Sequence, residues 1–210
     1  MKQRKKYLGM GLIEVMVSIA IFTMSMAGFT ALFLRSWKVN SYSFEMGQAS
    51  HTVSQGVNKV VNYLRKARQG DDGSYPIQSA GDNELIVFSD YNRDGITERL
   101  HFYLENGQLK MGATVPTIGI PKTYPVGDQE TLILADNIVN ASSEPVFYYY
   151  NSKYPSDQIN NPMVMPLDIS DVRLVKVLLK INIDPGRGPE NIETQSFVEI
   201  RNLNDYYQIK

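Results

Sequence analysis

Three oxygen-bearing side chains at alternate positions are the clearest candidates for chemistry in this sequence. Asp90, Asn92 and Asp94 precede Gly95, which gives the D-x-N-x-D-G order that opens a calcium-binding loop. Side-chain oxygens at alternate positions can wrap a hard cation, and the glycine allows the sharp turn that follows. Glu98, at the ninth position, could add a ligand or hold a water molecule. The pattern therefore predicts a calcium site formed by these four side chains.

The same residues also suit a turn without metal. The twelfth position is His101, where an EF-hand has a glutamate, so the full EF-hand pattern fails. Asp, Asn and Gly are also the residues that favour a tight connection between two strands. Calcium binding and a simple turn are therefore both open at this loop.

No other constellation in the sequence has the form of a catalytic site. Cysteine is absent, which excludes a disulfide framework, a cysteine nucleophile and a thiolate metal site. The two histidines, His51 and His101, are far apart without H-E-x-x-H spacing, and we expect both imidazoles in solvent. No G-x-S-x-G sequence occurs. We therefore predict that the protein is not an enzyme.

The charge distribution argues against a nucleic-acid partner. Four of the 21 basic side chains lie in the first nine residues, where there is no acid, and the rest of the chain is acidic on balance. Nucleic-acid binding normally needs a basic surface. The aromatic run 147–150 could stack on bases, yet no basic residue lies between 139 and 152. We predict that this run packs in a core and lines an exposed strand face.

A long apolar segment, residues 10–34, contains only one charged side chain, Glu14. A helix of this length spans about 37 Å, and the hydrocarbon core of a membrane is about 30 Å thick. The basic cluster before the segment predicts a cytoplasmic N-terminus and export of the rest of the chain. A secretory signal peptide cut after Ala27 is one alternative, but the apolar run continues to Leu34. A plain signal anchor is another, although a carboxylate inside a membrane helix is functional by default.

The residues around Glu14 resemble the processing site of type IV prepilins and type II secretion pseudopilins. A short basic leader is followed by the sequence Gly9-Met10-Gly11-Leu12-Ile13-Glu14. The resemblance implies cleavage by prepilin peptidase between Gly9 and Met10, and N-methylation of Met10. It also implies that Glu14, the fifth mature residue, neutralises the N-terminal ammonium of a neighbouring subunit in a filament. The chain departs from the common pattern in its first two mature residues, Met10 and Gly11, where Phe and Thr are commoner.

A second, weaker resemblance concerns the region beyond the helix. Residues 94–104 and the closing sequence 201–203 are similar to minor subunits related to the J-type pseudopilin. Together the two resemblances imply a structural minor subunit of a type IV pilus or a type II secretion-like filament. The implied partners are other pilin or pseudopilin subunits, prepilin peptidase and the inner membrane, with the head periplasmic or extracellular. The alternatives are a ligand- or DNA-binding minor pilin for uptake or adhesion, and an unprocessed bitopic membrane-anchored protein.

The helix that carries Glu14 is expected to continue into the head. Beyond Arg35, apolar residues recur every three or four positions, which is one stripe on an amphipathic helix. The stripe comprises Tyr42, Met46, Ala49, Val53, Val57, Val60 and Leu64. With no proline before Pro76, the pattern predicts one helix from Met10 to about Arg68, about 87 Å long, with Gly70 as its C-cap.

The remainder reads as strands separated by long loops. Expected strands lie at 85–88, 99–104, 109–111, 131–134, 146–150, 172–183 and 196–201, with a type I′ hairpin at Asn106-Gly107 and a turn at 185–189. The sequence therefore predicts four parts: a basic leader (1–9), a membrane or filament-core helix (10–34), an amphipathic helix (35–69) and a β-rich head (70–210). The expected fold is α+β and pilin-like, with the long helix packed on an antiparallel sheet.

Overall fold

The computed structural model describes residues 11–184 and 191–203. Gly9, Met10 and the expected turn at 185–189 lie outside these residues. The chain divides into two compact units, residues 1–45 and 46–210, which are treated separately below. The described elements are α1 (Leu12–Arg65), β1 (Ile77–Ala80), β2 (Glu84–Ser89), β3 (Glu98–Glu105), β4 (Gln108–Thr114), β5 (Glu130–Ala135), β6 (Phe147–Tyr150), η1 (Ile169–Asp171), β7 (Leu174–Ile181), β8 (Ile192–Glu199) and η2 (Arg201–Leu203).

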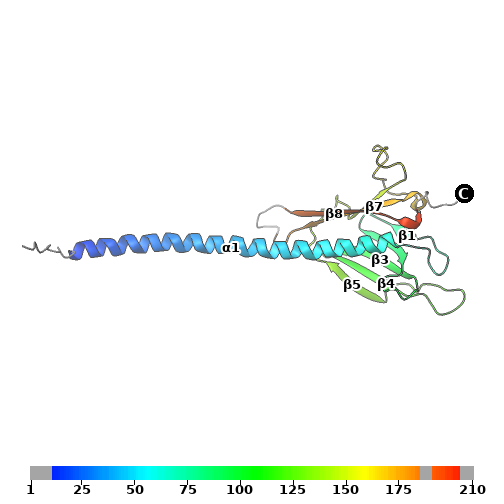
Figure 1. Cartoon of the computed structure of the whole chain (residues 1–210), viewed down its shortest axis with the longest axis horizontal. Coiled ribbons are helices and arrows are strands. Elements are labelled where there is room, and N and C mark those ends of the chain that lie inside the picture. Colours follow the sequence, from blue (N-terminus) through cyan, green and yellow to red (C-terminus); the bar gives the residue numbers. More distant parts are fainter. Residues whose placement is uncertain (1–10, 185–190, 204–210) are drawn as a thin grey trace, which may run out of the picture. The chain divides into compact units, whose positions relative to one another are not determined.

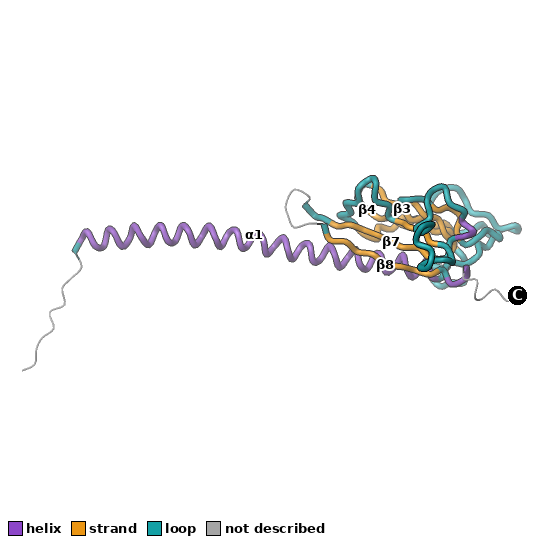
Figure 2. Tube along the Cα trace, turned by 90° about the horizontal axis from the view of Figure 1, so that it is seen from above, coloured by secondary structure: helices purple, strands orange, loops and turns teal. Residues whose placement is uncertain are grey.

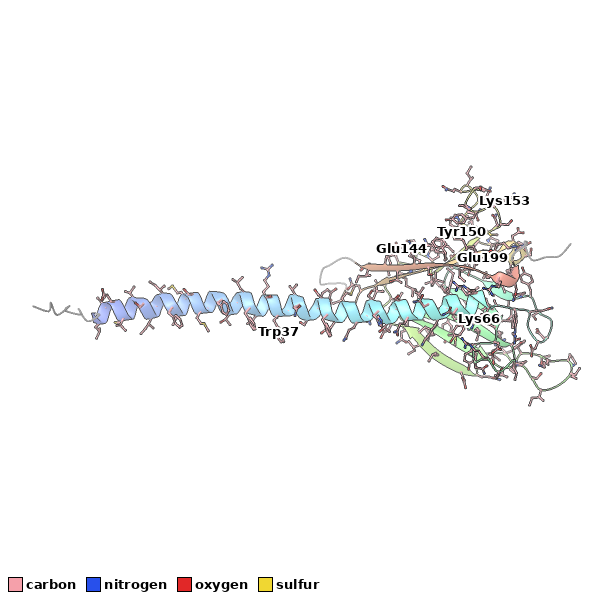
Figure 3. The ribbon with its side chains drawn as sticks, viewed as in Figure 1. Trp37, Lys66, Glu144, Tyr150, Lys153 and Glu199 are labelled. Carbon is pink, nitrogen blue, oxygen red and sulfur yellow. The ribbon has the colours of Figure 1, made fainter. Side chains whose placement is uncertain are left out.

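The described part of the first unit belongs to the apolar half of α1. Residues 11–40 are all exposed, including large side chains such as Phe22 at 69% and Leu32 at 70%. Trp37 projects from the helix in the same way (Figure 3) and is 64% exposed. The helix is long and apolar enough to cross a membrane. The sequence prediction of a membrane-length helix is therefore confirmed.

In the second unit, the amphipathic stripe of α1 packs into the core of the head. Its members from Met46 to Leu64 are all buried, and Val53, Val60 and Leu64 have no exposed surface. Those from Ala49 to Leu64 belong to one apolar cluster that also contains residues of every strand from β1 to β8. The predicted helix–sheet packing of an α+β fold is thus confirmed.

The helix ends earlier than predicted, at Arg65, and Gly70 is not its C-cap. The amides of Lys66 and Ala67 bond three residues back, and the amide of Arg68 then donates to the Phe88 carbonyl of β2, N···O 2.9 Å. A hydrogen bond to a strand that is 20 residues away in sequence therefore replaces the next helical one. Gly70 instead donates to the Ser74 carbonyl within the following turn.

The head contains two antiparallel sheets rather than the single sheet expected. One has the order β1-β2-β3-β4-β5 and the other the order β6-β7-β8. Asn106 and Gly107 join β3 to β4 with φ of 52° and 71°, the left-handed pair that a type I′ hairpin requires. Strand β1 was not predicted; it is four residues long and pairs with β2 through an irregular register.

The two sheets share the core around the helix. In Figure 1, β4 and β5 of the five-stranded sheet lie below the C-terminal part of α1, and β7 and β8 of the three-stranded sheet lie above it. Figure 2, the view from above, also shows β8 running along this part of the helix. An isolated bridge pairs Ile138, in the connection between β5 and β6, with Ile181 of β7, and the Tyr149 hydroxyl of β6 donates to the Gly81 carbonyl, just after β1, at 2.7 Å. Along β7, every second residue from Val175 to Ile181 is fully buried, as the alternation predicted.

Candidate functional site

Glu14 lies in the first turn of α1 and caps that turn. Its Oε2 accepts a hydrogen bond from the backbone amide of Gly11 at 3.0 Å. In return the Gly11 carbonyl accepts from the amides of Glu14 and Val15, at 3.0 and 3.3 Å. The Glu14 side chain therefore has the role of the glutamate in a capping box, because it accepts from an amide that has no helical partner. The carboxylate is therefore held at the positive end of the helix dipole.

Three of the four hydroxyl side chains in residues 15–34 bond to the backbone of their own helix. Ser18, Thr23 and Thr30 each donate to a carbonyl three or four residues earlier, at 2.7–2.9 Å. Polar groups in lipid must be satisfied within the protein, and these local bonds do so within the helix. Sequence reasoning treated the segment as uniformly apolar and missed this role of its hydroxyl residues.

Comparison with known families matches this N-terminal region. The family model described as the prokaryotic N-terminal methylation motif covers residues 4–30. That range includes part of the basic leader, Gly9, Met10, Glu14 and most of the apolar segment. By this motif the chain is type IV prepilin-like. The resemblance that was read from the residues around Glu14 is therefore confirmed.

The match ends before the head of this prepilin-like chain. Residues 31–210, which contain both sheets, lie outside the motif, so the J-type resemblance stays a prediction. No curated protein matches the chain. The head must therefore be interpreted from its own geometry.

In the prepilin-like head, the D-x-N-x-D-G loop joins β2 to β3 and folds onto its own backbone. Asp90 accepts from the amides of Arg93 and Gly95 with its two oxygens. Asn92 accepts from the Asp94 amide at 3.0 Å, and Asp94 accepts from the amide of residue 96 at 2.8 Å. Gly95 has a φ of 91°, which a glycine adopts without strain, whereas Arg93 has a φ of 66°, which is uncommon for a residue with a side chain.

The four predicted calcium ligands lie at this one loop and the start of β3. Within residues 11–184 and 191–203, however, no three His, Cys, Asp or Glu side chains converge closely enough to hold a metal ion among themselves. Asp90 also has a protein cation nearby, because Nη2 of Arg68 lies 3.7 Å from its Oδ2. Arg68 comes from the segment after α1, 22 residues earlier, and no local sequence signal pointed to it.

Glu98 is a buried carboxylate with an incomplete set of partners. The residue has no exposed surface. Its Oε2 accepts from the Tyr91 amide at 3.3 Å, whereas its buried Oε1 has no hydrogen-bond partner. Burial raises the pKa of Glu98, and the charges of Asp94 and Asp90 raise it further. The sequence placed Glu98 at a ligand position but gave no sign of its burial.

Polar contacts to Thr97 and Asp71 hold the loop 115–129 in place. The Tyr124 hydroxyl donates to the Thr97 carbonyl at 2.6 Å and accepts from the Asp71 amide at 3.1 Å. Burial raises the pKa of Tyr124 to about 12, so this proton is retained at physiological pH. Lys122 pairs with the Asp71 carboxylate at 2.6 Å, and this bond lowers the pKa of Asp71. A segment expected to be a plain loop is thus a fixed part of the head.

His101 is not the solvated imidazole that was expected. It lies on β3 between two carboxylates, with Nδ1 3.0 Å from Asp128 and Nε2 3.1 Å from Glu84. On the neighbouring strand, a Cβ at Gly112 would come within 2.1 Å of the Asp128 carboxyl, so the glycine makes room for that group. The partners are 17 and 27 residues from His101 in sequence, which hid the arrangement. His51 is exposed, as predicted.

The aromatic run 147–150 packs as predicted. Phe147 and Tyr149 are 1% exposed and belong to the core, while Tyr148 faces outward. The sheet register pairs Tyr148 with Lys176 of β7, whose Nζ lies 4.7 Å from the ring centroid. The aromatic run has no basic neighbour along the chain, but Lys176 lies beside Tyr148 on the adjacent strand.

Proposed function

We propose that the protein is a structural minor subunit of a type IV pilus or a type II secretion-like filament. Prepilin peptidase would cut the chain after Gly9, Met10 would be methylated, and α1 would pack among the helices of other subunits. The observation that carries this proposal is a glutamate at the fifth mature position of an exposed apolar helix, inside a matched methylation motif. The head would then lie on the outer side of the inner membrane.

The geometry of Glu14 supports a role in charge pairing. Only Oε2 is engaged by the Gly11 amide, and Oε1 has no hydrogen bond within the described residues. After cleavage, the new ammonium of Met10 would lie one residue before Gly11. The Glu14 carboxylate could then form an ion pair with the ammonium of a neighbouring subunit or with that of its own chain. An unpaired charge in an apolar filament core would be costly, which favours pairing by every subunit.

The substitution Glu14→Gln tests this proposal. The amide oxygen of Gln can still accept from the Gly11 amide, so the helix cap should persist while the charge is lost. Membrane insertion should be unchanged or improved, because a carboxylate in a membrane helix costs about 2.5–3.5 kcal/mol. Incorporation into filaments should fall about tenfold or more, since breaking a buried ion pair costs about 3–5 kcal/mol.

The measurement is the ratio of this subunit in sheared filaments to that in the membrane fraction. Glu45→Gln is the matched control, because Glu45 is an exposed glutamate on the same helix beyond the apolar segment. It should leave the ratio unchanged. Filament incorporation of Glu14→Gln at the wild-type level would refute the charge-pairing role.

A further inference from the structure

We propose that an exposed face of α1 in the head of one copy covers the free edge of β5 in a second copy of this chain. This inference rests on the proposed filament, because it names the surfaces through which two heads would meet there. The surface on α1 is called the basic face, and it consists of Gln55, Asn58, Lys59, Asn62, Arg65 and Lys66.

The first step in the argument is the free edge of β5. The strand is the last in the order β1-β2-β3-β4-β5, so within the described residues only one of its sides is paired with a strand. Its first four residues are exposed, and they include Leu132 at 48% and Ile133 at 52%. The strand contains neither lysine nor proline, the residues that commonly protect an edge. Another way to protect an edge is to cover it with a helix or a loop, which favours a covering partner here.

The second step is the basic face itself. Its members recur every three or four residues and are all exposed, whereas the apolar stripe between them is buried. Residues 46–70 include no acidic residue. Within residues 11–184 and 191–203, Lys59, Arg65 and Lys66 form no ion pair with a carboxylate. These three cations are therefore available to carboxylates of a second molecule.

The third step is the match in charge between the two surfaces. The segment 123–152, which contains β5, has four acidic residues and no basic one. Glu130 and Asp136 are exposed and flank Leu132 and Ile133. Lysine and arginine carry apolar stems below their charge, so the basic face can lay those stems on the apolar edge while its charges reach the two carboxylates. Its amide side chains supply donors and acceptors for the backbone of the edge.

The fourth step is the position of the two surfaces on one head. The helix and the edge strand are neighbours, because a Cβ at Gly56 would lie 2.4 Å from the Leu134 carbonyl oxygen, and Figure 1 shows β5 below α1. The basic face and the edge are different surfaces, so each copy offers one to each of two neighbours. Such a heterologous contact, if it does not close into a ring, builds an open helical filament. A symmetric contact between two basic faces would instead bring like charges together.

The test uses cysteine cross-linking of the full chain in membranes, since the sequence has no cysteine of its own. Asn62→Cys marks the basic face and Thr131→Cys marks the edge, and both positions are exposed. Cells that express both single variants should yield a cross-linked dimer with a short bismaleimide, whereas either variant alone should not. Gln195→Cys, at an exposed position of β8, is the matched control and should not cross-link to Asn62→Cys.

Charge reversal in this cross-linking pair tests the chemistry of the contact. Lys59→Glu together with Lys66→Glu should lower the cross-linked fraction about tenfold, because like charges would then face each other. Glu130→Lys together with Asp136→Lys should have the same effect. All four changes in every copy should restore cross-linking, and this recovery would show that the losses are not due to misfolding.

The outcomes separate this contact from the proposed function. If the chain enters filaments but the Asn62→Cys and Thr131→Cys variants do not cross-link, the contact is overturned and the filament subunit stands. Cross-linking in membranes by a chain that never enters filaments would support the contact and refute the filament. Cross-linking of Asn62→Cys to itself would overturn the heterologous contact. So would binding of double-stranded DNA that Lys59→Glu with Lys66→Glu abolishes while cross-linking is unchanged.

Discussion

Glu14 and Glu98 show how the environment of a glutamate determines whether its charged form is stabilised or destabilised. Glu14 is exposed on an apolar helix, and its carboxylate accepts an amide at the helix start. Glu98 is enclosed in the head, and one of its oxygens has no partner. The first glutamate gains from a helix dipole and a satisfied amide. The second loses the solvation of its charged form, which is why its pKa is raised.

Glu98→Gln should change how the stability of the head depends on pH. Because the folded chain holds the Glu98 proton more tightly than the unfolded chain does, the free energy of unfolding should fall as the pH rises. The fall begins near the ordinary value of 4.5 and is complete above the raised pKa. Each unit of the rise corresponds to about 1.4 kcal/mol. Gln keeps an oxygen for the Tyr91 amide but cannot ionise, so the variant should lack this fall.

The measurement is chemical unfolding between pH 4 and pH 8 in a chelating buffer, followed by the tyrosine circular dichroism signal. Glu193→Gln serves as the control, because Glu193 is exposed on β8, and it should preserve the wild-type profile. Parallel pH profiles for wild type and Glu98→Gln would contradict the cost assigned to ionising this carboxyl.

At the residue scale, the sequence reveals groups whose partners are close along the chain. The D-x-N-x-D-G order and the turn at Asn106 are visible because each depends on neighbouring residues. The ion pair of Arg68, the two carboxylates at His101 and the lysine at Tyr148 are invisible. Each of them depends on contacts between segments that are far apart in sequence, which local patterns do not specify.

At the scale of elements, the backbone of α1 lies very close to β5 at one glycine. A Cβ added at Gly56 would lie 2.4 Å from the Leu134 carbonyl oxygen, a distance that real atoms do not tolerate. Gly56 is buried in the middle of the helix, where glycine is otherwise unfavourable by about 0.5–1 kcal/mol. The helix accepts that cost because its backbone lies directly against a strand.

Two glycine substitutions on α1 should therefore have opposite signs. Gly56→Ala forces backbone apart and should destabilise the head by about 1–3 kcal/mol or more. Gly47→Ala lies on the same helix, is exposed and meets nothing within 4 Å, so it should stabilise by about 0.5–1 kcal/mol. The measurement is the free energy of unfolding of the full chain in micelles. Stabilisation by both substitutions would show that α1 can move away from β5.

The elements themselves were predictable where a pattern is long and regular. The apolar stripe of α1 and the alternation of β7 predicted both the type of each element and the face that packs in the core. The end of the helix was placed too late, because a hydrogen bond from Arg68 to Phe88 ends it and no capping residue does so. Strand β1 was missed because four residues are too short for an alternation to be recognised, and their pairing with β2 is what makes them a strand.

At the scale of the whole molecule, the chain combines a helix of membrane length with a head that has its own core. The apolar composition of residues 10–34 was enough to predict the membrane-length helix. The division of the head into two sheets was not predicted, because it depends on which strands pair across long loops. The pairing of β6 with β7 joins Phe147 to Val177, which are 30 positions apart.

Processing of the whole chain gives a direct test of its class. If prepilin peptidase acts after Gly9, the mature protein should begin at a methylated Met10. Gly9→Val should leave the uncut precursor in the membrane, with loss of nearly all processed product. Gly28→Val is the matched control, because Gly28 meets nothing within 4 Å and lies well inside the apolar helix. It should be cut as efficiently as wild type.

Mass spectrometry of the intact protein distinguishes the outcomes. A mass lower by the nine leader residues and higher by one methyl group supports the prepilin reading. A product that begins after Ala27 would indicate a secretory signal peptide, and an uncut wild-type chain would indicate a bitopic anchor. Either result would exclude assembly through the N-terminal helix.

The contact at Gly56 also has a mechanical consequence. If the chain assembles into a filament as proposed, tension along α1 would load the contact between α1 and β5 in shear. Every residue within a turn of Gly56 carries a Cβ, and sliding the helix would drive one of these atoms into the Leu134 carbonyl. The close approach at Gly56 therefore opposes sliding of α1 along β5. A force along the helix would be transmitted to the sheet before the helix could separate from the head.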